Sequence, residues 1–583
     1  MRDATRQQDG RPTTADGEAH PRGPRGPRGR AFRAAALGLA LATTITGAAC
    51  WLRSPGENEP PPAPPPGAPA AAGGASGAPG ASGAPAAPGS PRALFAGWPK
   101  PDLALVLSAQ QHGYILPCGC SRPQYGGLER RHNFIQGLRA DRGWAVVPLD
   151  LGDIPQMKGP ASLPNVQGLV KYRTTMEALK KMGYAAVSFG EYEAAQPLTD
   201  ALDEYALNNK EPAVLAASLL QRPELFPDGQ RRSKSYVGAW EVVPVKAGLK
   251  VGVIGSIAPS VAEKIKDPKF KIGRGDVVIP ETLRDMHAAE APDLRVLLLQ
   301  GSLEEAKKCA AALPQFHVIL CLAEEDEPPG RPEVVGDTFV IRVGHKGKNL
   351  GVVGVNRTDD PRKPFELRYQ LVTLGEEYQT PADKEAGHPI LALMERYTKE
   401  LRDENYLGRY SQGTHPVQFG AGQLPAYKDK PAAYAGSESC KSCHEHAYEV
   451  WKNSPHAHAY QTLVDARRPG LRQYDAECVT CHVVGFGYRT GFTSADKTPK
   501  LKDVGCESCH GPSLLHKENP NDVSLYSLIN PWKAKPGENA KDREKRMLAI
   551  EQDCQKCHDQ DNDVHWTFDK WTKKGIIHMT PTE

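Results

Sequence analysis

Eight of the 13 cysteines in the 583-residue chain fall near the C-terminal end, in four repeats of one short motif. In each repeat, two cysteines are separated by two residues and a histidine follows directly. The repeats are Cys440-x-x-Cys443-His444, Cys478-x-x-Cys481-His482, Cys506-x-x-Cys509-His510 and Cys554-x-x-Cys557-His558. Two thiols at this spacing can each form a thioether with one vinyl group of a porphyrin, while the adjacent histidine binds the iron as proximal ligand. The sequence therefore predicts four covalently bound haem c groups.

Zinc binding by the cysteine pairs and disulfide formation are the alternatives for these repeats. Both leave the histidine after the second cysteine without a role in all four motifs, so we favour haem attachment.

Further histidines could supply the distal ligands of the irons. Six remain after Ala432 once the proximal ones are set aside, and His415 lies just upstream. The six are His446, His456, His458, His516, His565 and His578. This surplus favours two-histidine ligation of some irons, which gives low-spin haem suited to electron transfer. The alternative for each is a surface or packing histidine.

The surroundings of the motifs match a known pattern over residues 434–583. Its segments are Gly436-Ser437, Trp451-x-x-Ser454-Pro455-His456-Ala457, Val483-Val484-Gly485-Phe486-Gly487 and Val504-Gly505-Cys506-Glu507-Ser508-Cys509-His510-Gly511-Pro512. They resemble the cytochrome c-554/c-prime family of multihaem cytochromes. The resemblance implies His456, His516 and His578 as distal ligands, with His565, His458 and His446 competing for the fourth place. It also implies that one iron can lack a sixth ligand.

Residues 98–375 show a different pattern, in which short apolar runs alternate with segments of helical periodicity. We expect strands at Leu103–Leu107, Trp144–Leu149, Ala185–Phe189, Lys250–Ile254, Arg295–Leu299 and Val318–Cys321. We expect helices at Gly168–Met182, Pro280–Ala289 and Leu303–Ala312. Such alternation predicts a layered α/β sandwich. Cys309 on a helix and Cys321 on a strand are expected to be buried core thiols.

This part also resembles the calcineurin-like metallophosphoesterases, and among them the 5′-nucleotidases. The matching segments are Ser108-Ala109-Gln110-Gln111-His112-Gly113, Gly126-Gly127-Leu128-x-Arg130-Arg131, Leu149-Asp150-Leu151-Gly152-Asp153 and Gly183 to Glu193. The family builds a two-metal site from Asp-x-His, Gly-Asp and Gly-Asn-His-Glu motifs and from later histidines.

Most of those ligands are replaced in this chain. Gln110 stands at the first Asp position, Glu191 at the Asn and Tyr192 at the His, while His112 and Asp153 remain. The stretches 299–301 and 322–325, where the later histidines are expected, contain none. Two intact ligands cannot hold two hard cations against water. We therefore expect a scaffold without ordinary phosphoesterase activity.

The α/β part adds a Cys118-Gly119-Cys120 pair, shortly after His112. These thiols could bind a divalent metal together with His112 or Asp153, or they could cycle as a redox dithiol. The alternative is a structural thiol pair or a disulfide.

The N-terminal segment predicts export from the cytoplasm. Five arginines between Arg22 and Arg33 precede a short apolar stretch, Ala34 to Ala49, and Cys50. Gly47-Ala48-Ala49-Cys50 resembles a bacterial lipoprotein box, which implies lipidation of Cys50 and attachment to a membrane surface. The alternatives are cleavage with a free Cys50 and an uncleaved anchor. Residues 61–90 contain only Pro, Ala, Gly and Ser, so we expect residues 51–97 to form a disordered tether.

The predicted organisation is a signal segment at 1–50, the tether at 51–97, the α/β domain at 98–375, a connector at 376–431 and a mainly α-helical or irregular tetrahaem domain at 432–583. The connector should contain a helix at Pro389–Leu401. Lys and Arg number 72 and Asp and Glu number 69, and this net charge of +3 argues against nucleic-acid binding. No apolar run reaches 18 residues, so no transmembrane helix is predicted.

We predict an electron-transfer protein of the bacterial periplasm or cell envelope that exchanges electrons with redox partner proteins. The alternatives are a haem-based reductase of a small nitrogen or sulfur compound, a phosphoesterase with a rebuilt metal site, and a binding lipoprotein stabilised by haem. An electron carrier or oxidoreductase is favoured over a hydrolase.

Overall fold

The computed structural model describes residues 94–568, apart from 120, 197–210, 221–236, 247, 269, 531 and 535. The predicted signal segment, Cys50, most of the tether, Cys120 and His578 lie outside the described residues. The chain divides into two units, Met1–Ser82 and Gly83–Glu583, and all described residues belong to the second.

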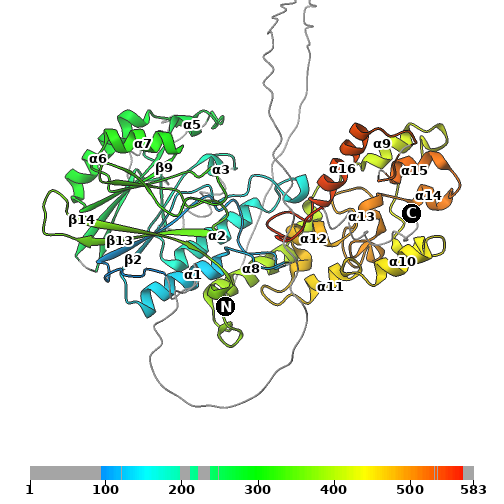
Figure 1. Cartoon of the computed structure of the whole chain (residues 1–583), viewed down its shortest axis with the longest axis horizontal. Helices are drawn as coiled ribbons and strands as arrows, with labels where there is room; N and C mark the ends of the chain where they lie inside the picture. Colours follow the sequence, from blue (N-terminus) through cyan, green and yellow to red (C-terminus); the bar gives the residue numbers. More distant parts are fainter. Residues whose placement is uncertain are drawn as a thin grey trace, which may run out of the picture. The chain divides into compact units, whose positions relative to one another are not determined.

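Two six-stranded sheets form the α/β part (Figure 1). The first has the order β14-β13-β1-β2-β3-β4, in which β1 to β4 are parallel and β13 and β14 form an antiparallel hairpin beside β1. Its strands are β1 (Leu103–Ser108), β2 (Val146–Asp150), β3 (Ala186–Ser188), β4 (Ala213–Leu215), β13 (Asn349–Arg357) and β14 (Phe365–Thr373).

The second sheet has the order β11-β12-β10-β9-β7-β6, with a parallel centre and antiparallel strands at both edges. Its strands are β6 (Trp240–Val245), β7 (Leu249–Ile257), β9 (Leu294–Gln300), β10 (Val318–Cys321), β11 (Glu333–Val335) and β12 (Thr338–Ile341).

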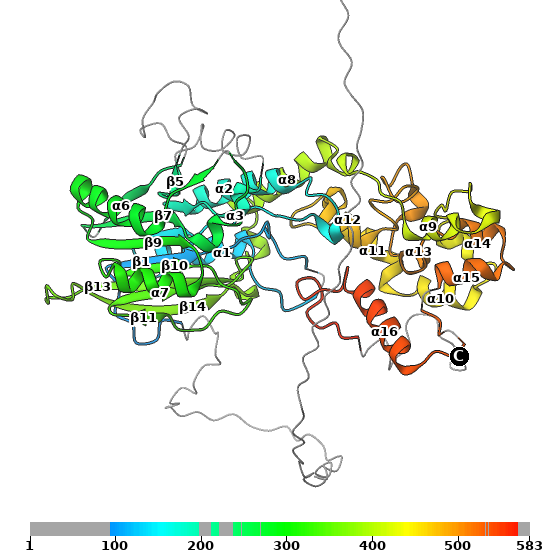
Figure 2. The ribbon, with the colours of Figure 1, turned by 90° about the horizontal axis from the view of Figure 1, so that it is seen from above.

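The two sheets pack face to face and carry helices on their outer faces (Figure 2). Alternate residues of each strand point into the core between the sheets, as Leu103, Leu105 and Leu107 do on β1. The first sheet is covered by α1 (Leu128–Gln136), α2 (Gly168–Met182) and α8 (Pro389–Asp403). The second is covered by α6 (Gly275–Glu290) and α7 (Leu303–Ala312). The layered α/β prediction is confirmed.

Two predicted boundaries of the α/β domain differ in the structure. Phe95 is buried and its ring packs edge-on against Trp98 and Trp144, so the core begins before residue 98. The helix expected in the connector is present as α8, but Leu393 and Tyr397 on it belong to the core under the first sheet. This helix is amphipathic because it covers a sheet, and it is part of the domain.

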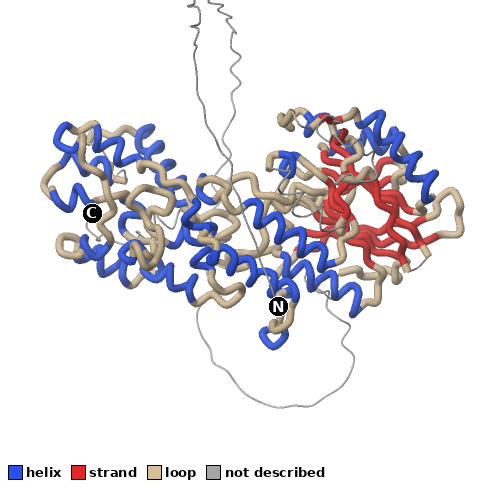
Figure 3. Tube along the Cα trace, turned by 180° about the vertical axis from the view of Figure 1, so that it is seen from behind, coloured by secondary structure: helices blue, strands red, loops and turns tan. Residues whose placement is uncertain are grey.

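The C-terminal part consists of short helices joined by loops, as predicted (Figure 3). Its α-helices are α9 (Pro416–Gly422), α10 (Glu445–Lys452), α11 (Ala459–Val464), α12 (Ala476–His482), α13 (Cys506–His510), α14 (Leu514–Glu518), α15 (Val523–Ile529) and α16 (Ala540–Cys554). The apolar clusters between them are small, as is typical of proteins in which haem supplies much of the core. None of the described helices has the length and apolar character needed to cross a membrane.

A buried polar network joins α12 to the α/β domain. The Asp475 carboxylate caps α12, accepting from Glu477 N at 2.9 Å, and it also accepts from Gln167 Nε2 at 2.9 Å and from the Tyr397 hydroxyl at 3.1 Å. Gln167 Oε1 in turn accepts from Ala476 N at 2.9 Å. Each buried polar group thereby finds a partner, so α12 has a fixed position on α2 and α8.

Replacing the acceptor of this network should destabilise the protein. Asp475→Ala removes a helix cap, leaves the buried Tyr397 hydroxyl without its acceptor and removes one of the two acceptors of Gln167 Nε2, which should lower the free energy of unfolding by about 3 kcal/mol. Urea titration followed by circular dichroism measures this. Asp383→Ala, at an exposed carboxylate, is the matched control. Equal stability of the two variants would contradict the proposed role of Asp475.

Candidate functional site

The four predicted haem motifs lie on different local elements of the C-terminal part. The second and third lie within α12 and α13, the fourth begins at the last residue of α16, and the first begins at the end of a short 3-10 helix, Ser437–Cys440. A helical turn places the two cysteines of a motif on nearly one face, since residues three apart are neighbours on a helix.

The motifs come together in pairs. The Cys440 thiol lies close to that of Cys506, and the Cys481 thiol lies close to that of Cys557. First and third motifs are therefore adjacent, as are second and fourth.

Glu507, inside the third motif, explains the first of these pairs. Its buried carboxylate accepts from Ala435 N at 2.8 Å and Gly436 N at 2.7 Å, just before the first motif, and from Ser513 N at 2.8 Å. Hydrogen bonds from three backbone donors offset the cost of burying this charge.

Three of the proximal histidines are oriented by a hydrogen bond at Nδ1. The partner is the Ala459 carbonyl for His482 (2.5 Å), the Ile529 carbonyl for His510 (2.8 Å) and the Asp563 carboxylate for His558 (2.9 Å). A ring held in this way keeps Nε2 for the iron, as is usual for metal-binding histidines. The residues present therefore fit a haem c at these motifs.

Two proximal histidines face a second histidine ring from a distant part of the sequence. The ring centroids are 6.3 Å apart for His444 and His516, and 6.1 Å apart for His456 and His558. Two imidazoles on opposite sides of one metal ion, with metal–nitrogen bonds of about 2 Å, have centroids about 6 Å apart. Burial lowers the pKa of His456 and His516, which favours the neutral ring that binds iron.

The other distal candidates occupy different surroundings. His446 and His458 are exposed. His415 caps α9, accepting from Val417 N at 3.2 Å. The Nε2 of His565 is hydrogen-bonded to the Arg122 carbonyl of the α/β domain. The assignment of His578 lies outside the described residues and stays a prediction.

At the carboxyl ends of the α/β strands, the side chains left at the metal-ligand positions bond to the protein itself. The Gln110 amide pairs with the backbone of Ala323 in both directions, at 2.8 and 3.1 Å. Asp153 Oδ1 accepts from Tyr192 N at 3.0 Å. His112 stacks on the Tyr192 ring, with centroids 4.5 Å apart. In the described part of the chain, no group of three or more His, Cys, Asp or Glu side chains is arranged to hold a metal ion.

This edge is buried and strained. Gln110, His112 and Asp153 all have left-handed backbones, with φ of 48°, 50° and 52°, a conformation that costs non-glycine residues about 1–3 kcal/mol each. Burial raises the pKa of Asp153 and of Glu193, whose carboxylate accepts from the backbone N of Asp153, Ile154 and Gly190. The backbone shape of a ligand site persists, and protein donors satisfy its polar groups.

The predicted second metal site is not assembled in this structure. Cys118 is in a disulfide, so it offers no thiolate to a metal, and Cys120 lies outside the described residues. The disulfide alternative fits Cys118. Cys321 is a buried core thiol as predicted, whereas Cys309 is half-buried and packs against the same core; burial raises the pKa of Cys309 to about 11 and that of Cys321 to about 12.

Sequence reasoning missed a second group of contacts between the domains. Lys346 and Lys348, before β13, both form ion pairs with Asp561, just after the fourth haem motif. Ser121, next to the Cys118 loop, donates to the Asn562 carbonyl at 3.0 Å and accepts from Val564 N at 3.0 Å. In the sequence, the only signal for the lysine contacts was that Lys346 and Lys348 are positive and Asp561 is negative. Opposite charge alone does not identify which residues pair when they are more than 200 positions apart.

The Asp563 carboxylate predicts a difference among the irons. A carboxylate on Nδ1 makes His558 more electron-donating and favours ferric iron. Asp563→Asn should raise one haem midpoint potential by about 60 mV, a tenfold change for a one-electron couple. Spectroelectrochemical titration of the holoprotein measures this. Asp496→Asn changes the same charge at an exposed site and should leave the potentials unchanged. Equal shifts in both variants would refute a specific effect.

Comparisons with known proteins match both parts of the chain. Residues 439–511 match the family model described as cytochrome c554 and c-prime. The curated cytochrome c-554 of Nitrosomonas europaea is 38% identical over 144 residues, which are 22% of this chain and 58% of that protein. The chain therefore spans less than two thirds of this relative's length.

Solved structures resemble the α/β part. The 5′-nucleotidase precursor of Thermus thermophilus has a TM-score of 0.41 and 18% identity, covering 52% of this chain and 59% of that one. The calcineurin-like phosphoesterase YfkN of Bacillus subtilis has a TM-score of 0.39 and 14% identity, covering 51% and 97%. Both scores lie below 0.5, and the fold described above rests on the strand order and packing of this chain. The motifs, the facing histidines and the family match together show that the C-terminal part of the chain contains a cytochrome c554 and c-prime family domain.

Proposed function

We propose that the protein is an extracytoplasmic tetrahaem c-type cytochrome that transfers electrons between redox partner proteins. The observation that carries this proposal is the pairing of His444 with His516 and of His456 with His558 at a separation that suits axial ligation of one iron. This separation is compatible with one metal ion held between the two rings of each pair.

Each side chain of the site has a separate task. The eight motif cysteines attach the cofactors, and three of the proximal histidines, His482, His510 and His558, orient Nε2 through their Nδ1 hydrogen bonds. His516 and His456 would close the sixth position of two irons. When bound, haem supplies one-electron exchange, and the protein sets its potential by ligation, burial and charge.

We further propose that the α/β domain acts as a scaffold that holds the haem domain and does not hydrolyse phosphoesters. Gln110 Oε1 accepts a hydrogen bond from Ala323 N, and Asp153 Oδ1 accepts one from Tyr192 N, at positions where a hydrolase needs metal ligands. The same domain makes the buried contacts that fix α12.

The proposed location is the bacterial cell envelope, with lipidated Cys50 as anchor to a membrane surface. The basic and apolar N-terminal segment supports export, and haem c attachment by Cys-x-x-Cys-His motifs suits an exported protein.

One observation favours a second candidate function, redox chemistry on a small nitrogen or sulfur compound. Within the described residues, no second histidine ring faces His482 as His516 faces His444. An iron at His482 with an open sixth position would be able to bind a small molecule.

The first expected outcome is the cofactor count. The purified holoprotein should contain four covalent haems per chain by pyridine haemochrome assay, because each motif presents two cysteines and a histidine. Serine replacement of both Cys478 and Cys481 should reduce the count to three. Two or fewer haems in the wild type would contradict the proposal.

Electron paramagnetic resonance of the same oxidised protein distinguishes the two candidate functions. A carrier with two axial ligands on every iron gives a purely low-spin spectrum, whereas an open iron gives a high-spin component. We expect His516→Ala to convert one low-spin signal to high-spin and exposed His446→Ala to leave the spectrum unchanged. No change in the His516 variant would refute this ligand assignment.

The scaffold role has its own test. The full-length holoprotein should show no hydrolysis of a nucleoside monophosphate when Mn²⁺ or Zn²⁺ is added, because the ligand positions are replaced or bonded internally. A colorimetric phosphate assay measures this. Metal-dependent turnover that is lost on Asp153→Asn would demonstrate a rebuilt hydrolase site.

A further inference from the structure

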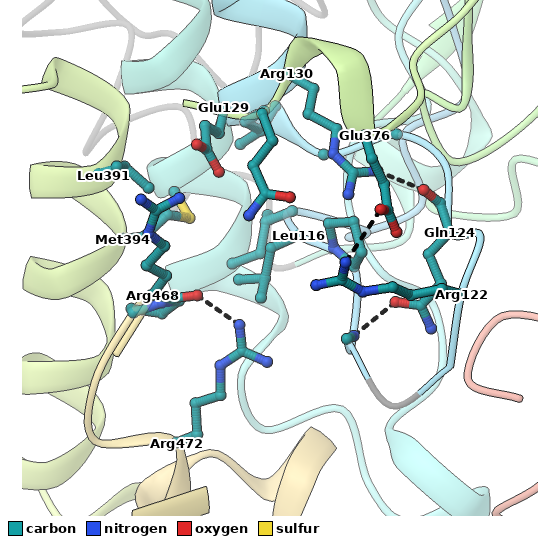
Figure 4. Close-up of a pocket in the computed structure, with 18 of the residues that line it drawn as sticks. Leu116, Arg122, Gln124, Glu129, Arg130, Glu376, Leu391, Met394, Arg468 and Arg472 are labelled. Carbon is teal, nitrogen blue, oxygen red and sulfur yellow. Dashed lines mark hydrogen bonds and ion pairs between the residues drawn. The ribbon is translucent and has the colours of Figure 1, made fainter. Parts of the chain in front are cut away.

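A small cavity lies where the Cys118 loop of the α/β domain meets the segment before the second haem motif. Its volume is about 120 Å³, and its walls come from residues 115–117, 119, 121, 122, 124 and 126–130, from Glu376 and Gln379, from α8 and from the turn that holds Arg468 and Arg472. Four arginine side chains approach it from different sides: Arg122, Arg130, Arg468 and Arg472 (Figure 4). No predicted function uses this cavity.

The charges around the cavity do not cancel. Glu129 and Glu376 are the acidic side chains that line it, against four arginines. Arg122 forms an ion pair with Glu376 at 3.3 Å. Arg468 pairs with Glu385, outside the lining. With Glu129 as the third nearby carboxylate, the group carries one net positive charge, and Arg130 and Arg472 are the two arginines without an ion pair among the described residues.

Arg130 and Arg472 direct their hydrogen bonds to carbonyl oxygens, which carry no net charge. Arg130 donates to the Gln124 carbonyl. Arg472 donates to the carbonyls of Cys118 at 2.6 Å and Arg468 at 2.5 Å. Within the described ranges, neither arginine has a carboxylate oxygen within ion-pair distance. These bonds hold the guanidinium groups in place and leave their charge available.

Two further facts show that this arrangement costs energy without a ligand. Arg130 is only 7% exposed, so a full positive charge is buried beside the cavity. The Nε of Arg472 is buried and has no hydrogen-bond partner among the residues that the structure describes. Burying an unpaired donor of a charged group costs more than burying a neutral one, and an orphaned donor in a native protein calls for an ion, a water or a function.

We propose that this cavity is a binding site for a small oxyanion, which pairs with Arg130 and Arg472. Guanidinium groups present parallel N–H donors that match the oxygens of sulfate, nitrite or a carboxylate, and such charge-assisted bonds are strong where water is scarce. The volume suits a free anion of a few heavy atoms. Arg122, whose side chain is 73% exposed, stands at the rim and adds long-range attraction.

The position of the site gives the bound anion an effect on the haem domain. Arg472 is the first residue of a short 3-10 helix, Arg472–Tyr474, that leads into Asp475 and α12. An anion on Arg472 would therefore link the Cys118 loop to the segment that carries Cys478, Cys481 and His482. This inference does not require electron transfer, so it can fail while the proposed function holds.

Isothermal titration of the holoprotein with sodium sulfate, against sodium chloride at equal ionic strength, tests the site. We expect one sulfate per chain with a Kd of about 1 mM. Arg472→Gln should weaken binding at least about tenfold, because it removes the charge and the unpaired Nε donor. Arg362→Gln is the matched control. The Arg362 side chain is 93% exposed, pairs with the nearby Asp360 and does not line the cavity.

A second variant and a second ligand test the proposal independently of Arg472→Gln. Arg122→Gln at the exposed rim should fold normally and weaken binding about threefold, with a smaller dependence on salt. Adenosine monophosphate tests whether the anion is free or the end of a larger molecule, and it should bind at least about tenfold more weakly than sulfate because the cavity is small. The proposal is overturned if sulfate gives no heat beyond chloride, if the Arg472 and Arg122 variants both bind like wild type, or if the nucleotide binds more tightly.

Discussion

The buried carboxylate of Asp475 is the interaction on which the relation between the two domains depends. It caps α12 by accepting from Glu477 N in the haem part. It also accepts hydrogen bonds from Gln167, just before α2, and from Tyr397 on α8. A carboxylate buried this completely is tolerated only when several donors surround it. The second haem motif therefore has a fixed place on the α/β domain, while the segment after the fourth motif has its own contacts with that domain through Asp561.

The parts of the structure that depend on local chemistry could be predicted from the sequence. The haem motifs are contiguous, and strands such as β1 and β10 are apolar runs that stay recognisable without their neighbours. The β13–β14 hairpin and the burial of α8 under the first sheet depend on contacts with residues more than 200 positions away. The same holds for His456 and His558, which are about a hundred residues apart and meet only in the folded chain. The motif spacing in the sequence identified which residues could bind iron. Which two histidines face each other depends on the packing of the folded chain.

At the sheet edge, the side chains at the positions that the sequence resemblance assigns to metal ligands are held by hydrogen bonds from the protein itself. Gln110, His112 and Asp153 keep left-handed backbones, although hydrogen bonds from Ala323 and Tyr192 now occupy the side chains that could bind metal. Backbone shape at the carboxyl ends of parallel strands is set by sheet packing, so it can outlast the chemistry for which it is suited. A resemblance in fold therefore predicts the scaffold better than the activity.

Net charge gives a similarly incomplete picture of binding. The whole chain carries only +3, yet two arginines without carboxylate partners meet at one small cavity in the described structure. Long-range attraction follows total charge, but a buried site responds to the few groups that surround it, because the dielectric there is low. The cavity lies on the segment between Arg468 and Asp475, which also leads into the anchored helix α12. A ligand there would act on the contact that fixes the second haem motif, since both involve the same short stretch of chain.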